Sequence, residues 1–206
     1  MIVLHAITLP LSPGTDTEGL QAYAAPTVTV LYDEVDHAPP VDRASVLHHG
    51  LRVSRLGDRL AVLPMRYGTT VETLAELTEL VAAHDTTWSE RLSVVRGHCE
   101  LIVHVDTADE EALPRAGSGR EYLLARAQLL RQQATALDEV SDVVRPWSRD
   151  LHILSGGERL AALVPRRLAT PAREAVTDWA ATRRGVRVAV TGPWPPFSFC
   201  GEQAAS

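Results

Sequence analysis

The sequence predicts an α+β protein of two lobes. Three observations lead to this class: β-branched runs alternate with stretches of helical periodicity, 45% of the 206 residues are hydrophobic, and a small, acidic stretch interrupts the pattern near the middle. A chain of this length and composition can form one large core or two smaller ones. We place the lobes at residues 1–106 and 119–206, joined by a linker at 107–118.

The N-terminal lobe is expected to be a mixed α/β sheet lobe. Residues 1–9 and the β-branched run 27–32 predict two strands, separated by a turn-rich stretch. A short helix is predicted over 42–55, and a turn at Gly57 leads into a strand over 59–65. The apolar stripe expected to face the core on this helix consists of Val46, Leu47, Leu51 and Val53.

A long amphipathic helix is predicted over 70–96. Thr69 and Glu72 form a capping box at its start, and Gly97 is a natural stop. The strand 99–106 follows directly, and this adjacency assigns it to the first lobe. The helical residues expected to point inward are Val71, Leu74, Leu77, Val81, Trp88, Leu92 and Val95.

The second lobe is expected to begin with a helix over 119–144. Its predicted inward residues are Tyr122, Leu123, Leu130, Ala134, Leu137 and Val144. A hairpin over 151–164 follows, and then a helix capped by Thr170 and a last strand. Counted from Cys99, the order is strand, helix, strand, strand, helix, strand. This is the split βαβ order of ferredoxin-like folds, and it competes with placing 99–106 in the first lobe.

The end of the chain, the tail 192–206, concentrates the few aromatic residues of the sequence. Aromatic residues make up 5% of the chain, yet three lie within six positions, Trp194, Phe197 and Phe199. Prolines fix φ and remove amide donors, so we expect an extended, proline-rich strap that leaves the sheet. The strap can close onto its own protein or present its aromatic side chains to a partner.

Charge and cysteine content exclude several classes of protein. The formal charge is −6, and the basic residues are all Arg, so nucleic acid is not an expected partner. Two cysteines are too few for a disulfide-built secreted domain and fit a cytoplasmic protein. No window approaches the roughly 20 apolar residues of a membrane span.

The sequence carries no enzyme, metal or cofactor signature. The histidines nearest to a cluster, His48, His49, His98 and His104, lack the spacing of a zinc site, and solvated histidines are the simpler interpretation. No nucleophile elbow is present, and a phosphate-binding P-loop requires a lysine that the chain lacks. We therefore expect no catalytic residues, no metal and no cofactor.

Two motifs resemble those of the gas vesicle protein F and L family. The first runs from Val62 to Thr69 and includes Pro64, Arg66, Tyr67 and Gly68; the family has Val-Leu-Pro-Met-Arg-Phe-Gly-Thr. The second resembles the family's Gly-Pro-Trp-Pro-Pro-Tyr-Ser-Phe and reads Gly192, Pro193, Trp194, Pro195, Pro196, Phe197, Ser198, Phe199. His48-His49, residues 97–103 and residues 119–123 extend the resemblance over nearly the whole chain. It leaves the F and L subtypes open.

The resemblance implies a non-enzymatic assembly factor or minor component of cytoplasmic gas vesicles. Its implied partners are the hydrophobic shell protein, bound during vesicle formation, and other gas vesicle accessory proteins. The alternative is a small-molecule-binding or catalytic ferredoxin-like protein of the cytoplasm. We expect the turn at Arg66, Tyr67 and Gly68 to face the strap 192–199 between the lobes.

Overall fold

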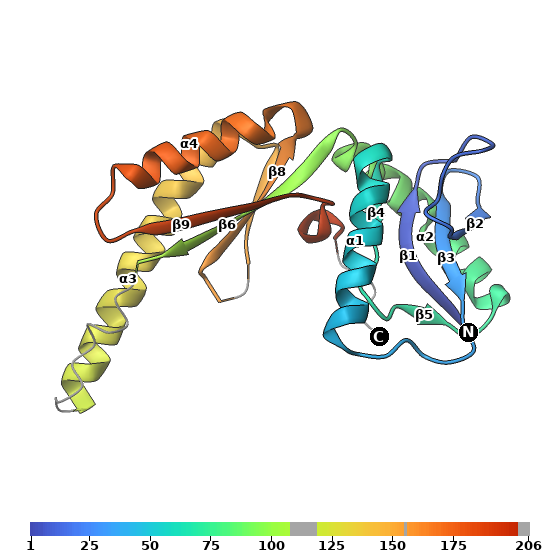
Figure 1. The fold of residues 1–206 in the computed structure, drawn as a ribbon, viewed down its shortest axis with the longest axis horizontal. Helices are drawn as coiled ribbons and strands as arrows, with labels where there is room; N and C mark the ends of the chain where they lie inside the picture. The colour runs from blue at the N-terminus through green and yellow to red at the C-terminus, as the bar shows by residue number, and fades with distance from the viewer. Residues whose placement is uncertain (108–118, 155, 202–206) are drawn as a thin grey trace. The chain divides into compact units, whose positions relative to one another are not determined.

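The structure is a computed structural model that describes residues 1–107, 119–154 and 156–201. It divides into two compact units. The first consists of Met1–Gly97 together with the segment from Trp194 onward, and the second is His98–Pro193. Both units combine an antiparallel sheet with helices, which confirms the α+β class (Figure 1).

The first unit contains a five-stranded sheet. Its order is β2-β3-β1-β4, with β5 also paired to β1, and every pairing is antiparallel. The predicted first strand is present as β1, whereas the turn-rich stretch after it contains an unpredicted strand, β2. The strands are β1 (Ile2–Thr8), β2 (Gln21–Ala24), β3 (Thr29–Glu34), β4 (Val62–Pro64) and β5 (Thr70–Val71).

Two helices pack on this sheet, α1 (Arg43–Arg59) and α2 (Leu74–Val95). Both contact β1 and β4, and all seven residues of β1 are buried. Alternate residues of a strand point to opposite faces, so complete burial of β1 requires that both faces of the sheet are covered.

The predicted face of α1 is wrong except at Val53, which is buried. Val46, Leu47 and Leu51 are 45%, 59% and 48% exposed, whereas His49 and Gly57 are buried. The helix also continues through Gly57 to Arg59, where a turn was predicted. The reason is tertiary. His49 packs inward because it bonds to His5 and to the Met65 carbonyl, and Gly57 because Pro195 lies against it. Hydrophobic periodicity does not detect such contacts.

Helix α2 begins one turn later than predicted. Thr70 and Val71 pair with β1 as strand β5, so the backbone is extended where the helix was expected. The N-cap is Thr73, whose hydroxyl oxygen accepts from the amide of Glu76 at 3.2 Å. The Thr69 hydroxyl instead donates to the Arg66 carbonyl, and the capping box predicted at Thr69 is absent.

The second unit contains a four-stranded antiparallel sheet of order β7-β8-β6-β9. Helices α3 and α4 contact each other and the central strand β8. Along the chain the elements are β6 (His98–Asp106), α3 (Gly119–Val144), β7 (Asp150–Ile153), β8 (Arg159–Pro165), α4 (Ala169–Ala181) and β9 (Arg187–Trp194).

Strand 98–106 belongs to the second unit, which corrects the first-lobe boundary at 106. It pairs with β8 from His98 opposite Pro165 to His104 opposite Arg159. This ladder outweighs the adjacency in sequence to α2 that favoured the first lobe. The predicted linker 107–118 lies outside the described residues except for Thr107.

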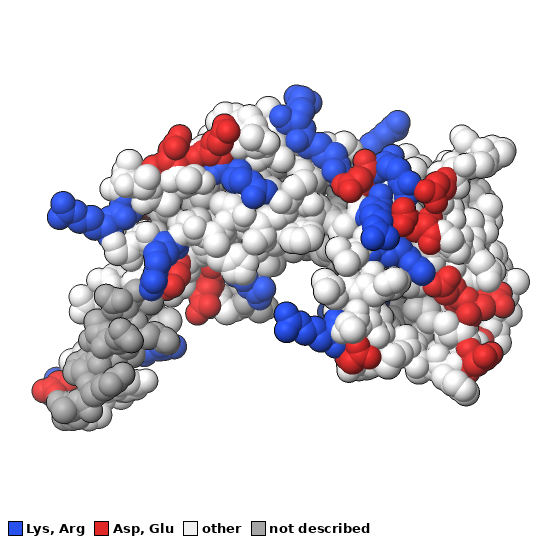
Figure 2. All heavy atoms as spheres, viewed as in Figure 1, with Lys and Arg blue, Asp and Glu red and all other residues white. Residues whose placement is uncertain are grey.

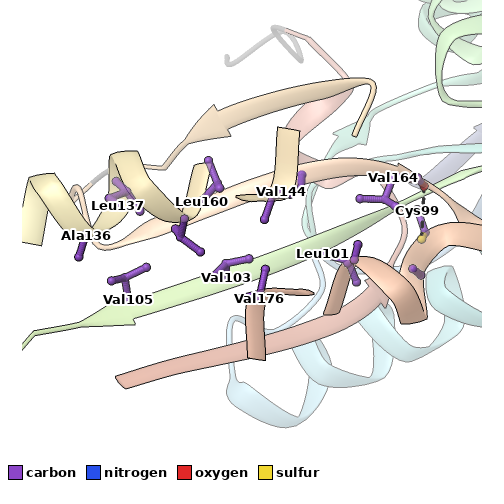
Figure 3. Packing of buried hydrophobic residues seen from close by; sticks show 14 residues of the cluster. Cys99, Leu101, Val103, Val105, Ala136, Leu137, Val144, Leu160, Val164 and Val176 are labelled. Carbon is purple, nitrogen blue, oxygen red and sulfur yellow. Dashed lines mark hydrogen bonds between the residues drawn. The ribbon is translucent and has the colours of Figure 1, made fainter. Parts of the chain in front are cut away.

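The core of the second unit forms where alternate residues of β6 and β8 meet the helices (Figure 3). Cys99, Leu101, Val103 and Val105 point to the same side of β6, and all are at most 2% exposed. They pack with residues of β8, α3 and α4, including Leu160, Val164, Leu137, Val144 and Val176.

Two details of the predicted helices in this unit are wrong. Tyr122, Leu123 and Leu130 of α3 are between 47% and 67% exposed, because the N-terminal part of the helix extends past the strands (Figure 1). Helix α4 begins at Ala169, and its N-cap residue Leu168 makes no side-chain cap, so Thr170 is not the cap.

The last strand runs further than predicted. Strand β9 includes Gly192, Pro193 and Trp194, and a short 3₁₀ helix follows at Phe197–Phe199. The Gly192–Pro193 peptide bond is cis. An extended strap leaving the sheet at residue 192 is therefore wrong in its boundary, since three of the predicted strap residues are part of the strand.

Candidate functional site

The first motif, residues 62–69, forms the edge strand β4 and the turn after it. Pro64 is the last residue of this edge strand, as expected for a residue without an amide donor. The turn is closed by the amide of Thr69, which donates to the Arg66 carbonyl at 3.1 Å. Gly68 has φ +82°, a value that favours glycine.

Tyr67, which belongs to this turn, lines a pocket in the first unit. Its hydroxyl donates to the Pro40 carbonyl at 2.7 Å, and its ring meets His49 edge-on with centroids 5.5 Å apart. The pocket has a volume of about 460 Å³. Its walls come from β1, β3, α1 and the segment between β3 and α1, and include Val3, His5, Asp33, Val35, Pro39 and Arg52.

A β-bulge in β1 turns His5 toward α1. The register against β3 shifts between Leu4 and Ala6. His5 contacts His49 of α1, and its neighbour Ala6 packs in a cluster with Leu56 of the same helix. Two consecutive residues therefore face one helix, which regular alternation forbids and the extra residue of a bulge allows.

A chain of hydrogen bonds fixes where the protons of the two buried histidines lie. The Met65 carbonyl can only accept, so His49 Nε2, 3.0 Å away, carries a hydrogen. In a neutral ring His49 Nδ1 is then an acceptor, and His5 Nδ1, 3.0 Å from it, is the donor. The remaining nitrogen, His5 Nε2, is left as an acceptor.

Burial keeps both rings neutral. It is the main cause that lowers the pKa of His5 to about 4; the charge that His49 would carry lowers it further, and Asp33 partly opposes the change. The pKa of His49 is also lowered, again chiefly by burial, against the hydrogen bond to Met65. His5 and His49 are only 8% and 4% exposed, so the expectation of a solvated histidine is wrong for His49.

Asp33 and Arg52 form an ion pair in the same wall. Arg52 Nη1 donates to Asp33 Oδ2 at 2.6 Å, with both side chains partly exposed. More ion pairs lie further along α1: Arg59 binds Asp16 and Glu18, and Arg55 lies 3.6 Å from Glu18. Acidic and basic groups are accordingly interleaved on the first unit (Figure 2).

The second motif packs onto α1. Pro195 and Pro196 are buried, and an ideal Cβ on Gly57 would lie 3.1 Å from Pro195 Cγ. Glycine at position 57 thus allows the close approach of this segment to the helix. Phe199 and Cys200 are also buried, whereas Trp194 and Phe197 are 41% and 40% exposed.

Both motifs have residues in the first unit, but their described contacts differ. Those of Tyr67 run to Pro40 and His49, and those of Pro195 run to Gly57. That the Tyr67 turn faces the strap remains a prediction. Sequence reasoning missed His5, Asp33 and Arg52, which no motif connects; the one available signal was a histidine within an otherwise apolar first strand.

Outside this pocket, Cys99 lies in the core and the described residues offer no metal site. Cys99 is fully buried, its Sγ lies 3.6 Å from the Val164 carbonyl, and burial raises the pKa of its thiol. Within residues 1–107, 119–154 and 156–201, no three His, Cys, Asp or Glu side chains gather as a metal site would require. In the same ranges no helix combines the length and apolar character of a membrane span.

The fold and its pocket define a two-unit α+β protein whose polar site lies inside the first unit. The sequence model of the family described as gas vesicle synthesis protein GvpL/GvpF matches residues 3–201. The chain belongs to this family, a family of gas vesicle proteins that is not known as one of enzymes, and membership supports a role related to gas vesicles.

Two solved structures have a similar fold. The crystal structure of the gas vesicle protein GvpF from Anabaena sp. PCC7120 superposes with a TM-score of 0.78 at 16% identity, covering 100% of this chain and 97% of that one. GvpF from Microcystis aeruginosa gives a TM-score of 0.75 at 14% identity, with 97% and 98% covered. No curated protein sequence matches the chain.

Proposed function

We propose that this protein is a non-enzymatic assembly factor or minor component of gas vesicles that binds the hydrophobic shell protein during vesicle formation. Family membership over residues 3–201 supports the gas vesicle role. The observation that carries shell-protein binding is the exposure of Trp194 and Phe197 on a segment whose neighbours Pro195, Pro196 and Phe199 are buried.

The segment 194–199 is suited to binding an apolar surface of another protein. Aromatic side chains bury large apolar areas at a low cost in conformational entropy, and a segment anchored by buried prolines is already ordered before it binds. An apolar shell subunit would otherwise expose surface that aggregates. Cytoplasmic, vesicle-associated location and contacts with other accessory proteins follow from the same proposal.

We also propose that the second unit is a ferredoxin-like lobe. Its elements follow the order β6, α3, β7, β8, α4, β9, and the sheet order is β7-β8-β6-β9. The rival function is small-molecule binding or catalysis by a ferredoxin-like protein. The pocket lined by His5, Asp33 and Arg52 lies in the first unit, so it gives no support to a site in the second.

The test is a deletion strain scored for vesicles by electron microscopy and rescued with variants. Trp194→Ala combined with Phe197→Ala should fail to restore vesicles and should lose co-purification with the shell protein. Ile153→Ala, which removes a side chain 58% exposed on β7, is the matched control and should rescue fully. Intact vesicles in the deletion strain, together with no co-purification of the unaltered protein, would contradict the proposal.

A further inference from the structure

Helix α3 has two halves that share one apolar stripe. The stripe repeats at alternating steps of four and three residues, which is the spacing at which two helices pair side by side. It consists of Leu123, Ala127, Leu130, Ala134, Leu137, Ser141 and Val144. Leu137, Ser141 and Val144 of the C-terminal half are buried, whereas Leu123 and Leu130 of the N-terminal half are 67% and 55% exposed. The same stripe is therefore core in one half of the helix and surface in the other.

The N-terminal half of α3 lies beyond the end of strand β6. The side-chain amide of Gln133 donates to the Val105 carbonyl at 3.0 Å, one residue before β6 ends at Asp106. Residues 119–132 precede this bond and extend past the strands over about 20 Å (Figure 1). Tyr122 and Leu124 are exposed there as well. Folding of the second unit does not account for this row of large apolar side chains on the surface.

The composition of this half favours a helix. Residues 120–134 are all Arg, Glu, Leu, Ala and Gln apart from Tyr122, and these five types are among the strongest helix formers. A helix of this length is only marginally stable in water unless its apolar face packs against something. Another helix laid along the stripe would supply that packing.

We propose that the N-terminal half of α3 is a docking surface for an acidic amphipathic helix of another protein. The partner helix packs its own apolar stripe against Leu123 and Leu130, and the small Ala127 between them lets the two helices approach closely. Its carboxylates lie beside the stripe and meet Arg126 and Arg131. This surface belongs to the second unit and is independent of the shell-protein contact proposed above for the segment 194–199.

Charge selects an acidic partner over a second copy of this chain. Residues 119–134 contain three arginines and one glutamate, so this half of the helix is positive. With Ala127 and Leu130 between two paired helices, the flanking positions are Arg126 and Arg131. A parallel second copy would place Arg126 opposite Arg131 of the other copy, and an antiparallel one would bring equivalent arginines together. Both arrangements are repulsive, whereas glutamates at the flanking positions attract.

Binding is tested on the full chain with a labelled synthetic helix of repeated Glu-Ile-Ala-Ala-Leu-Glu-Gln heptads. Fluorescence anisotropy should give a Kd of about 10–100 μM, as expected for a small interface. The same peptide with Lys in place of Glu should bind at least about tenfold more weakly, and salt should weaken binding of the Glu peptide. Equal binding of the two peptides, or no binding of the Glu peptide at about 1 mM, would overturn the proposal.

Variants locate the surface. Leu123→Gln combined with Leu130→Gln should weaken binding of the Glu peptide about tenfold or more. Leu47→Gln, at a side chain 59% exposed on α1, is the matched control and should leave binding unchanged. Arg126→Glu combined with Arg131→Glu should reverse the preference, so that the Lys peptide binds more tightly. Unaltered binding in the leucine variant, or an unaltered preference in the arginine variant, would refute the surface.

Two other occupants are tested with the same proteins. We expect the unaltered chain to be monomeric in sedimentation equilibrium and not to bind phosphatidylserine vesicles. Dimerisation that is lost on combining Leu123→Gln with Leu130→Gln would assign the surface to a second copy. Vesicle binding that is lost in the same variant would assign it to a lipid surface. Either result would overturn the proposal of an acidic helix.

Discussion

The interiors of the two units contain different kinds of side chain. On the helix side of its sheet the second unit buries aliphatic residues and Cys99 at alternate positions of β6 and β8 (Figure 3), while the titratable Glu100 of β6 is buried on the other side. The first unit buries His5 and His49 beside the ion pair of Asp33 and Arg52.

The difference concerns how the stability of each unit responds to pH. Aliphatic packing stabilises without regard to pH, whereas buried titratable groups make stability depend on it. The unit that buries the two histidines also contains the pocket described above. Comparing the responses of the two units to substitution and to pH therefore tests whether this division is real.

The largest effect is expected from the aliphatic core. Leu101→Ala deletes a side chain that is 1% exposed and should cost about 3 kcal/mol of unfolding free energy through lost burial and a cavity. Urea unfolding followed by NMR signals of β6 measures it. Leu130→Ala, at a site 55% exposed on α3, is the control and should change stability by less than about 0.5 kcal/mol. Similar costs for both would mean that α3 packs differently.

The first unit should lose stability in mild acid. The pKa of His5 is about 4 in the folded state, below the 6.5 of a free histidine. The unfolded chain therefore binds more protons, so stability is complete above about pH 6.5 and falls as the pH approaches 4. We expect a loss of about 2 kcal/mol between about pH 8 and pH 5, measured in urea by NMR signals of β1.

The matched variants for this effect are His5→Gln and His152→Gln. His5→Gln should make the pH profile shallower whatever its stability at neutral pH, and the slope that remains comes from His49, whose pKa burial also lowers. His152→Gln on the exposed strand β7 should leave the profile unchanged. An equally steep loss in the signals of β6 would contradict a division between the units.

Two glycines of α1 should respond in opposite ways. Gly50 has no atom within 4 Å of an ideal Cβ, so Gly50→Ala should stabilise by about 0.5–1 kcal/mol. Gly57→Ala would place its Cβ 3.1 Å from Pro195 Cγ and should lose that gain or destabilise. Thermal unfolding measures both. Equal stabilisation would show that the C-terminal segment does not pack against this helix.

The last prediction concerns helix caps, which also differ between the units. Thr73→Ala removes the side-chain cap of α2 and should cost about 1 kcal/mol. Thr170→Ala should cost less than about 0.5 kcal/mol, because the N-cap of α4 is Leu168, which makes no side-chain bond. Equal losses in urea unfolding would place a cap at Thr170 after all.

The sequence predicted the second unit better than the first. Strands β6, β7 and β8 and helices α3 and α4 were all predicted, because β-branched runs and helical periodicity mark these elements along the chain. Strand β2 was missed, since Gln21–Ala24 is short and mostly exposed. The face of α1 was wrong because His49 and Gly57 are buried by partners distant in sequence.

The candidate site shows the same limit. Tyr67 was singled out by its motif, and it does line the pocket. His5 could not be predicted to point at α1, since that depends on a bulge in the pairing of β1 with β3. Arg52 and Asp33 come into contact only when α1 packs on the sheet, so no local sequence pattern predicts their ion pair.

The path of the chain has a consequence for the order of folding during synthesis. The second unit is one continuous stretch, His98–Pro193, whereas the first is completed only by the segment from Trp194 onward. The first unit therefore cannot place Pro195 against Gly57 until the whole of the second unit has been synthesised.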